Sequence, residues 1–315
     1  VPGTTWNSTQ PLHGSSNTHT MQLKTDGTAW VWGNNASGNL GLNNLIKLSS
    51  PTQLPGTNWS ITNAHDKNFV TNANIFSVKT DGTLWAWGSG YIGALGQNDV
   101  VGEYGANYSS PIQVGTDTTW NKTVTSRAIK TNGTLWAWGL NQYGQLGLND
   151  SGTSPGPDAQ RDATARSSPT QVGTNTTWAA VTGGSSMYAV KTDGTLWSWG
   201  LNEGGRLGQN QGGAWPSYGV PYSSPKQVGS GTDWKQDMRA ITVAGESCAA
   251  MIKTDGTLYM VGRNNNGCLG QNDTVNRSSP VQVPGTTWST IDVDYFQTVV
   301  ATKTDGTGWG WGYSS

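Results

Sequence analysis

Few residues in this chain of 315 are suited to acid–base or metal chemistry. The histidines His13, His19 and His65 lack the short spacings of metal ligands, and we expect His19 to be a structural residue before an apolar segment. Cys248 and Cys268 are predicted to be free thiols, with a bond between them as the alternative. The sequence therefore predicts no catalytic group, no metal centre and no cofactor.

The aspartates occur where turns use them. One set precedes glycine in a repeated Lys-Thr-Asp-Gly-Thr pentapeptide, where a hairpin turn occupies the carboxylate. This set is Asp26, Asp81, Asp193, Asp255 and Asp305. A second set follows asparagine after a Leu-Gly pair and comprises Asp99, Asp150 and Asp273. These side chains could ligate calcium, but the Asp-x-Asp-x-Asp-Gly spacing of a calcium loop is missing, so we expect them to cap turns.

Residue types typical of binding surfaces occur in three insertions between Leu-Gly and Ser-Ser-Pro. The insertions at 97–108, 148–166 and 209–222 have 12, 19 and 14 residues, whereas the same segment elsewhere has seven. Tyr, Trp and Arg are enriched at binding hot spots. The residues that we predict to form one binding face are Tyr104, Tyr108, Arg161, Arg166, Trp215, Tyr218 and Tyr222. The alternative is a tolerated expansion of loops on a stable scaffold.

Composition excludes several classes of protein. The formal net charge is −1 and the pI is about 6.3, so the chain has no electrostatic footprint for nucleic acid. No segment approaches the ~18 apolar residues of a membrane-spanning helix, so membrane insertion is not expected. Only 12% of residues are charged, whereas 44 are glycine and 17 are tryptophan. Because Gly, Thr, Asn and Trp favour turns and strands, the composition predicts an all-β fold.

One pattern recurs six times along the chain. The pentapeptide, with Asn for Asp in one copy, begins at Lys24, Lys79, Lys130, Lys191, Lys253 and Lys303. A lone Trp and an apolar segment precede it; in most copies Trp-x-Trp-Gly, Asn-x-x-Gly-x-Leu-Gly and Ser-Ser-Pro-x-Gln follow it. Asp-Gly between alternating segments predicts a hairpin with a type I′ turn, in which both central residues have positive φ.

Three to four short strands in each of six copies of about 50–60 residues indicate a β-propeller. In Trp85-Ala86-Trp87 both indoles share one face of the strand, and the alanine lies on the other. Sheets with one bulky and one small face interlock when they stack. We therefore expect the repeated tryptophans to pack the core rather than to bind a ligand.

The segments 189–200 and 141–147 resemble the repeats of the regulator of chromosome condensation family, and the resemblance covers essentially the whole chain. It implies one β-propeller domain, residues 1–315, with four-stranded blades. The family usually has seven blades, whereas this chain has six copies. Residues 1–6 repeat 283–288, so we expect the two ends to complete one shared blade; seven blades are the alternative if the chain is a trimmed part of a longer array.

Uniform repeats with few charges resemble phage and bacterial members of this family more than nuclear ones. We therefore expect a non-enzymatic binding or structural module on a virion, as a phage tail or capsid-surface protein, or at a cell surface. Its partners would be a host protein, a surface glycan or neighbouring virion proteins, and not nucleic acid. The alternative is a secreted inhibitor or regulator of an enzyme, because the family includes a nucleotide exchange factor and a β-lactamase inhibitor.

Overall fold

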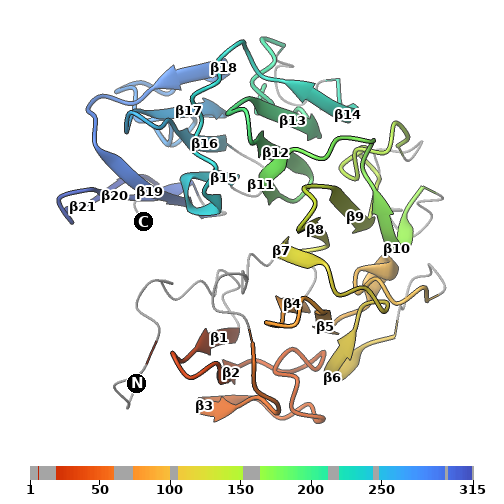
Figure 1. Ribbon diagram of the computed structural model, residues 1–315. Coiled ribbons are helices and arrows are strands. Elements are labelled where there is room, and N and C mark those ends of the chain that lie inside the picture. The colour runs from red at the N-terminus through yellow and green to blue at the C-terminus, as the bar shows by residue number, and fades with distance from the viewer. Residues whose placement is uncertain are drawn as a thin grey trace. The chain divides into compact units, whose positions relative to one another are not determined.

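The computed structural model describes Trp6 and residues 19–59, 74–99, 106–151, 164–211, 220–243, 248–294 and 297–313. These residues form six antiparallel sheets (Figure 1). The two described helical elements are single turns of 3-10 helix, η1 (Tyr91–Gly93) and η3 (Met238–Ala240). The predicted all-β fold of six repeats is thus confirmed. Within the described residues, no helix has the length and apolar character needed to span a bilayer.

Contacts within the chain define two compact units, residues 1–140 with 156–172 and residues 141–155 with 173–315. A single domain of 315 residues stays a prediction. The blade shared by both ends also stays a prediction, because residues 1–5 and 314–315 lie outside the described part of the chain.

Unit 1 contains three sheets whose strands pair in sequence order. The first sheet comprises β1 (His19–Leu23), β2 (Ala29–Gly33) and β3 (Leu48–Gln53). The second comprises β4 (Asn74–Val78), β5 (Leu84–Gly88) and β6 (Tyr108–Gln113). The third comprises β7 (Trp120–Val124), β8 (Arg127–Lys130), β9 (Leu135–Gly139) and β10 (Arg166–Gln171). In each of the first two sheets, a single bridge stands where the third sheet has its first strand, β7. Trp6 pairs with Lys24 in the first sheet, and Trp59 pairs with Lys79 in the second.

Unit 2 contains the other three sheets, again with strands paired in sequence order. One comprises β11 (Trp178–Gly183), β12 (Ser186–Lys191), β13 (Leu196–Gly200) and β14 (Tyr222–Gln227). The next comprises β15 (Ile241–Val243), β16 (Cys248–Ile252), β17 (Leu258–Gly262) and β18 (Arg277–Gln282). The last comprises β19 (Trp288–Val293), β20 (Thr298–Lys303) and β21 (Gly308–Gly312).

The Asp-Gly turns are three-residue loops, so the type I′ prediction is wrong. At the turn between β12 and β13, Gly194 N donates to Lys191 O at 2.9 Å, and Lys191 N donates to Thr195 O at 3.0 Å. Gly194 has a φ of 79°, whereas Asp193 is not among the residues with positive φ. Asp193 Oδ1 accepts hydrogen bonds from Thr195 N at 2.9 Å and Thr195 Oγ1 at 2.6 Å. These bonds favour a type I turn followed by a left-handed glycine over the tighter hairpin.

Sheets within a unit bury a small face against a bulky one. In unit 1, Ala86 of β5 shares a buried cluster with Trp120 and Trp138 of the third sheet. In unit 2, Ala250 of β16 shares a cluster with Trp288 of β19. The predicted packing role is confirmed for the buried tryptophans, which are the first Trp of repeats two to six and Trp87, Trp138 and Trp199, whereas Trp85 and its equivalents remain partly or largely exposed.

A hydrogen bond from an indole also joins neighbouring sheets. In four repeats, the second Trp of Trp-x-Trp-Gly donates Nε1–H to a loop carbonyl of the preceding repeat. The pairs are Trp87 with Asn39 (2.9 Å), Trp138 with Ala94 (2.9 Å), Trp199 with Gln145 (3.1 Å) and Trp311 with Cys268 (2.8 Å). The fifth repeat has Val261 at this position. There the carbonyl of Arg206 instead accepts a hydrogen bond from the hydroxyl of Tyr188 at 2.6 Å.

The loop Asn-x-x-Gly-x-Leu-Gly is fixed on the next repeat. In unit 2, the buried Asn141 accepts from Leu146 N at 3.0 Å through Oδ1, which holds the loop's shape. Asn149 N then donates to Ser223 O at 2.8 Å. Gly144 approaches the same serine so closely that a Cβ atom would lie 2.6 Å from Ser223 Cα. Glycine is therefore required at this position by contact as well as by its φ of 74°.

Candidate binding site

The lysine that begins each pentapeptide lies over two aromatic rings. In the second repeat, Lys79 Nζ is 4.8 Å from the ring centre of Trp59 and 4.0 Å from that of Trp85. Such cation–π contacts stabilise an ammonium group that is partly removed from water. The other sets are Lys24 with Trp6 and Trp30, Lys130 with Trp120 and Trp136, Lys191 with Trp178 and Trp197, Lys253 with Trp234 and Tyr259, and Lys303 with Trp288 and Trp309.

The hairpin positions these three side chains. Trp59 bridges to Lys79, and Trp85 lies diagonally across the hairpin on the same face. The indole of Trp85 is held by a short chain of hydrogen bonds: its Nε1 donates to Thr83 Oγ1 at 2.8 Å, and Thr83 Oγ1 donates to Asp81 Oδ1 at 2.6 Å. The hydrogen bonds from Thr83 hold the pKa of Asp81 below its usual value. The turn carboxylate therefore orients a ring and is not an acid or base.

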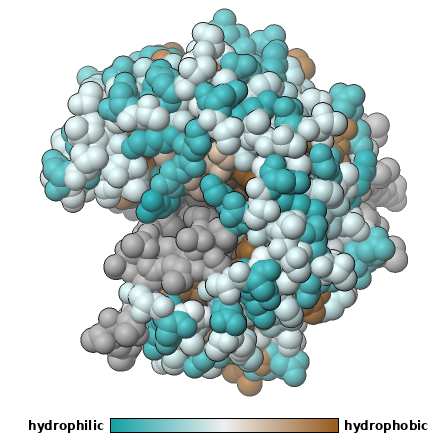
Figure 2. Space-filling view, in the orientation of Figure 1, coloured by the Kyte–Doolittle hydropathy of each residue, from teal (hydrophilic) through white to brown (hydrophobic). Residues whose placement is uncertain are grey.

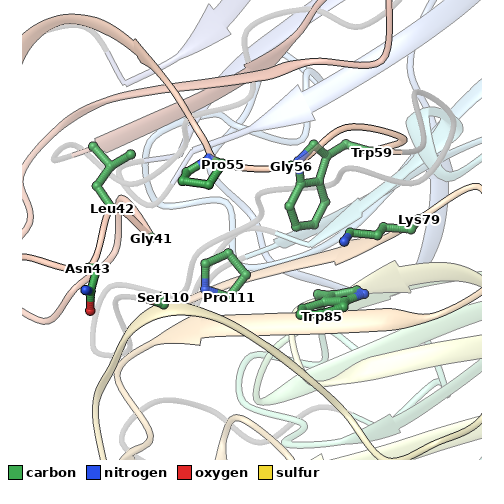
Figure 3. Close-up of a pocket in the computed structure, with 10 residues that line it drawn as sticks. All are labelled: Gly41, Leu42, Asn43, Pro55, Gly56, Trp59, Lys79, Trp85, Ser110 and Pro111. Carbon is green, nitrogen blue, oxygen red and sulfur yellow. The ribbon is translucent and has the colours of Figure 1, made fainter.

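In unit 1, a cavity of about 320 Å³ opens beside Lys79, between the first and second sheets. Figure 3 shows the ammonium group of Lys79 between the rings of Trp59 and Trp85 and directed toward the cavity. The lining comes from the loop after β2, the turn after β3, the aromatic pair and β6. It comprises Gly41, Leu42, Asn43, Pro55, Gly56, Trp59, Lys79, Trp85, Ser110 and Pro111.

A cavity of about 330 Å³ lies at the equivalent position in unit 2, between the sheets β11–β14 and β15–β18. Lys253 and the rings of Trp234 and Tyr259 form one wall, and Ser279 and Pro280 of β18 form another. The same strand and loop positions line both cavities. The repeat therefore builds a concave surface at the junction between sheets, with an aromatic floor, a proline and one ammonium group.

The two cavities differ in charge. Lys253 Nζ forms an ion pair with Asp233 Oδ2 at 3.1 Å. The third repeat has the same arrangement, because Lys130 Nζ pairs with Asp117 Oδ2 at 2.5 Å. The hydrogen bond from Lys130 lowers the pKa of Asp117 to about 2. Among the residues that the structure describes, no carboxylate pairs with Lys79. The cavity of unit 1 thus contains a cation that forms no ion pair with a described carboxylate, although its charge contributes to the lowered pKa of the turn residue Asp81.

Three of the seven residues predicted to bind lie in the described part of the chain. Tyr108, Arg166 and Tyr222 are the first residues of β6, β10 and β14, so they occupy equivalent positions in three repeats. The remaining four lie outside the described residues and are Tyr104, Arg161, Trp215 and Tyr218. The predicted binding face as a whole therefore stays a prediction.

The described members of this set hold the ends of their own insertions. Tyr108 donates its hydroxyl to Asp99 Oδ2 at 3.2 Å, across the ends of the second repeat's insertion. Tyr222 donates to Gln211 Oε1 in the same way in the fourth repeat. Arg166 Nη1 donates to Thr164 O at 2.5 Å. Burial and the negative charge of Asp99 raise the pKa of Tyr108, so its hydroxyl remains a donor at neutral pH.

The remaining candidates have structural roles. His19 is 2% exposed, and burial lowers its pKa to about 4, so it is neutral at physiological pH. Cys248 and Cys268 are buried free thiols, as predicted. Asp273 Oδ1 accepts from Val275 N at 2.9 Å, which confirms the predicted turn cap. Within the described ranges, no group of three or more His, Cys, Asp or Glu side chains is arranged to hold a metal ion.

Sequence reasoning missed the lysine–aromatic cavities, because recurrence in every copy was interpreted as scaffold. The available signal was spacing. The lysine and the second ring are separated by six residues in all six copies, as in Lys79 and Trp85. Across a three-residue loop, this spacing places the two side chains diagonally on one face of the hairpin.

Known proteins share this repeat. The model of the regulator of chromosome condensation (RCC1) repeat matches residues 26–63, 132–190 and 255–293. The chain is 25% identical over 272 residues to the ultraviolet-B receptor UVR8 of Arabidopsis thaliana, covering 83% of this chain and 55% of that protein. It is 26% identical over 275 residues to the mitochondrial RCC1 domain-containing protein RUG3 of the same plant, with the same coverage. The chain thus spans about half the length of these curated relatives.

Solved structures share the fold. Prp20p from Saccharomyces cerevisiae superposes with a TM-score of 0.69 at 20% identity, over 95% of this chain and 70% of that one. Human WBSCR16 superposes with a TM-score of 0.70 at 18% identity, over 94% and 74%. The repeated hairpins, the indole-linked sheets and these matches lead to one conclusion: the chain is an RCC1-like β-propeller, with three segments that match the RCC1 repeat model.

Proposed function

We propose that this chain is a protein-binding module that carries out no reaction of its own. The observation that carries the proposal is the recurrence of a concave surface at an equivalent junction between sheets in both units. Cavities of this size accept a side chain or another small group, and aromatic rings supply contact area at low conformational cost. The turn aspartates, which are the most frequent acidic groups in the repeat, accept hydrogen bonds from the threonine two residues later, as Asp81 and Asp255 do.

The relatives support the same kind of function. One solved yeast structure shows Kap60 bound to yeast RCC1 (Prp20), and another concerns the binding of Prp20p to Gsp1p and histones. The chain also matches the probable E3 ubiquitin-protein ligase HERC6 of Homo sapiens, but it corresponds to only 27% of that protein. We therefore propose a binding role for this chain, and not a ligase activity.

The described surface favours contacts of small area with a binding partner. In Figure 2, the hydrophobic side chains of the described residues form scattered patches between polar ones. Leu45 and Ile46 are exposed, at 61% and 66%, in the loop that also contributes Leu42 and Asn43 to the unit 1 cavity. Exposed apolar side chains beside a cavity are typical of an interaction site.

Display on a virion or cell surface is the finer part of the proposal. It is supported by the sequence, with 12% charged residues and six closely similar repeats. The insertion face that contains Trp215 and Tyr218 would be a second contact surface, for a host protein, a surface glycan or neighbouring virion proteins. Immunogold labelling of intact particles with an antibody against the chain should decorate the particle surface, and labelling confined to disrupted particles would contradict surface display.

Binding itself can be tested with the immobilised chain and two panels of ligands. One panel is a displayed library of random peptides, and the other is an array of glycans. We expect saturable binding to peptides that share a motif, and we expect replacement of Leu45 and Ile46 by Asp to weaken it. Val275, which is 58% exposed in the seven-residue loop of the fifth repeat and outside the insertions, provides the control in Val275→Asp. If no peptide is retained, the chain is not a peptide-recognising module.

A further inference from the structure

We propose that the unit 1 cavity around Lys79 binds a carboxylate carried by a polypeptide. This inference rests on the proposed protein-binding function and names the chemical group that is recognised. Its basis is a comparison among the repeats of this chain, which place the same lysine and the same two rings in different electrostatic surroundings.

Two repeats show that a carboxylate fits beside the lysine while the rings stay in contact. Lys130 Nζ is 3.8 Å from the ring centre of Trp136 and pairs with Asp117 at 2.5 Å. Lys253 Nζ is 5.0 Å from the ring centre of Tyr259 and pairs with Asp233 at 3.1 Å. In both cases the carboxylate comes from the turn that precedes the first Trp of the repeat. The arrangement therefore has room for an oxygen ligand in addition to the rings.

The fourth repeat supports the same interpretation with a neutral ligand. There Lys191 Nζ donates to Asn175 Oδ1 at 3.4 Å, and Asn175 occupies the position of Asp117 in the aligned turn. Three repeats thus supply their own oxygen atom to the lysine. An ammonium group retains donors beyond its cation–π contacts, and a charged acceptor satisfies them best.

In the second repeat, no described residue supplies such an oxygen ligand to the lysine. Its turn reads Pro55-Gly56-Thr57-Asn58 and contains no acidic residue. Lys79 is half-buried between its rings, and among the described residues no carboxylate pairs with it. Because the ammonium group faces a cavity of about 320 Å³, a carboxylate from another molecule can take the position that Asp117 and Asp233 occupy elsewhere (Figure 3).

The walls of the cavity favour a polypeptide over an acidic sugar. Leu42, Pro55 and Pro111 surround the lysine and the rings, whereas Asn43 and Ser110 are the other polar side chains of the lining. A sugar ring presents several hydroxyl groups that each need a partner, and this lining provides few. An acidic residue flanked by apolar ones matches the cation, the apolar walls and the exposed apolar loop beside them.

The test uses the full chain labelled with ¹⁵N at tryptophan, with the Trp85 indole signal assigned through Trp85→Phe. The probe is the peptide Gly-Pro-Leu-Glu-Leu-Gly, N-acetylated and C-terminally amidated, and its matched control has Gln in place of Glu. A third peptide, the Gln form with a free C-terminus, reports whether a terminal carboxylate serves as well as a side chain. We expect the Glu peptide to shift the Trp85 signal and to bind at least tenfold more tightly than the amidated Gln peptide.

Variants at the lysines provide the decisive comparison. Lys79→Met keeps the apolar stem over the rings and removes the charge, so it should reduce affinity for the Glu peptide about tenfold, and Lys79→Arg should retain binding. Lys253→Met, in the cavity that already has Asp233, should change nothing. Asp233→Ala, which leaves no side-chain oxygen on Lys253, should make the second cavity available and add a Lys253-dependent shift of the Trp234 indole signal. Thermal melting of each variant shows that it is folded, and the gain of a site in Asp233→Ala does not depend on the stability of Lys79→Met.

The outcomes separate the inference from the proposed function. Equal affinity of Lys79→Met and the wild type for the Glu peptide, or equal affinity of the wild type for the Glu and amidated Gln peptides, would overturn the carboxylate assignment. If library peptides still bind in that case, the protein-binding function stands without it. A tri-uronic acid that shifts Trp85 more strongly than the Glu peptide, and only when Lys79 is present, would overturn the assignment to a polypeptide.

Discussion

Replacing Trp138 by phenylalanine should destabilise the protein far more than the same change at Trp136, two positions earlier in β9. Trp138 is fully buried and donates Nε1–H to the carbonyl of Ala94 in the preceding repeat at 2.9 Å. Trp136 is partly exposed and donates to Thr134 Oγ1 in its own hairpin, also at 2.9 Å. Both indoles make edge contacts with Trp120, at centroid distances of 6.4 Å and 6.0 Å. The pair therefore compares the same substitution between sheets and within one.

The magnitude follows from what each substitution leaves behind. Trp138→Phe leaves a buried carbonyl without its donor, which costs about 1–3 kcal/mol. The smaller ring also leaves a void at a fully buried position, which adds about 1 kcal/mol. The free energy of unfolding should therefore fall by about 2–4 kcal/mol. Trp136→Phe removes a bond within one hairpin, and its acceptor, the Thr134 hydroxyl, still donates to Asn132 Oδ1 at 2.8 Å, so about 0.5–1 kcal/mol is expected.

Urea unfolding followed by far-ultraviolet circular dichroism measures the two losses, with unchanged slopes showing that both variants unfold in the same way. Hydrogen exchange should show faster exchange of residues 91–95 in Trp138→Phe and no change there in Trp136→Phe. Equal losses, or a larger loss at Trp136, would refute the idea that indole hydrogen bonds between sheets hold the repeats together.

Two further predictions concern a close contact and a buried histidine. Gly144 and Gly267 occupy the same loop position with φ of 74° and 71°, but only a Cβ at Gly144 would meet a neighbour within 4 Å, at Ser223. Gly144→Ala should therefore lower the urea midpoint clearly more than Gly267→Ala, and equal effects would show that backbone strain alone decides the cost. His19 has a folded pKa of about 4, below the 6.5 of the unfolded chain, so the unfolded state binds the proton first as the pH falls. Stability should decrease from about pH 6.5 to pH 4. His19→Asn should flatten this dependence, and an unaltered profile in melts at pH 7 and pH 4.5 would contradict the role of His19.

The repeated pattern was sufficient to predict the strands. The alternation in segments such as 135–139 and the Pro of Ser-Ser-Pro are local properties, and they recur in the structure as β9 and as the outer strands. The packing role of the tryptophans also followed, because a face of large rings has to be buried wherever the strand lies. The turn type did not follow. The dipeptide Asp-Gly suits two turns, and the hydrogen bonds from Thr195 to Asp193 decide between them.

The candidate site, too, was only partly predictable from the sequence. The sequence identified Tyr108, Arg166 and Tyr222 by residue type, and the structure shows that they hold the ends of insertions through contacts with their own loops. The lysine of each repeat was visible in the sequence but had no assigned role. Neither its rings nor its counter-charge can be identified from composition, because the rings depend on which side chains the hairpin places on one face and the counter-charge on whether the turn before the first Trp reaches the ammonium group.

The sequence by itself determined the number of repeats, the order of their strands and which residue types face inward, since these properties depend on periodicities of a few residues. Only the tertiary structure decided where a cavity forms, because its lining from Gly41 to Pro111 is separated along the chain and meets only when two sheets stack. Among the described residues, it also decided which lysines pair with a carboxylate and which, like Lys79, do not. Lys130 and Lys253 share the pentapeptide with Lys79, and the difference lies in whether an acidic side chain of the preceding turn reaches the ammonium group.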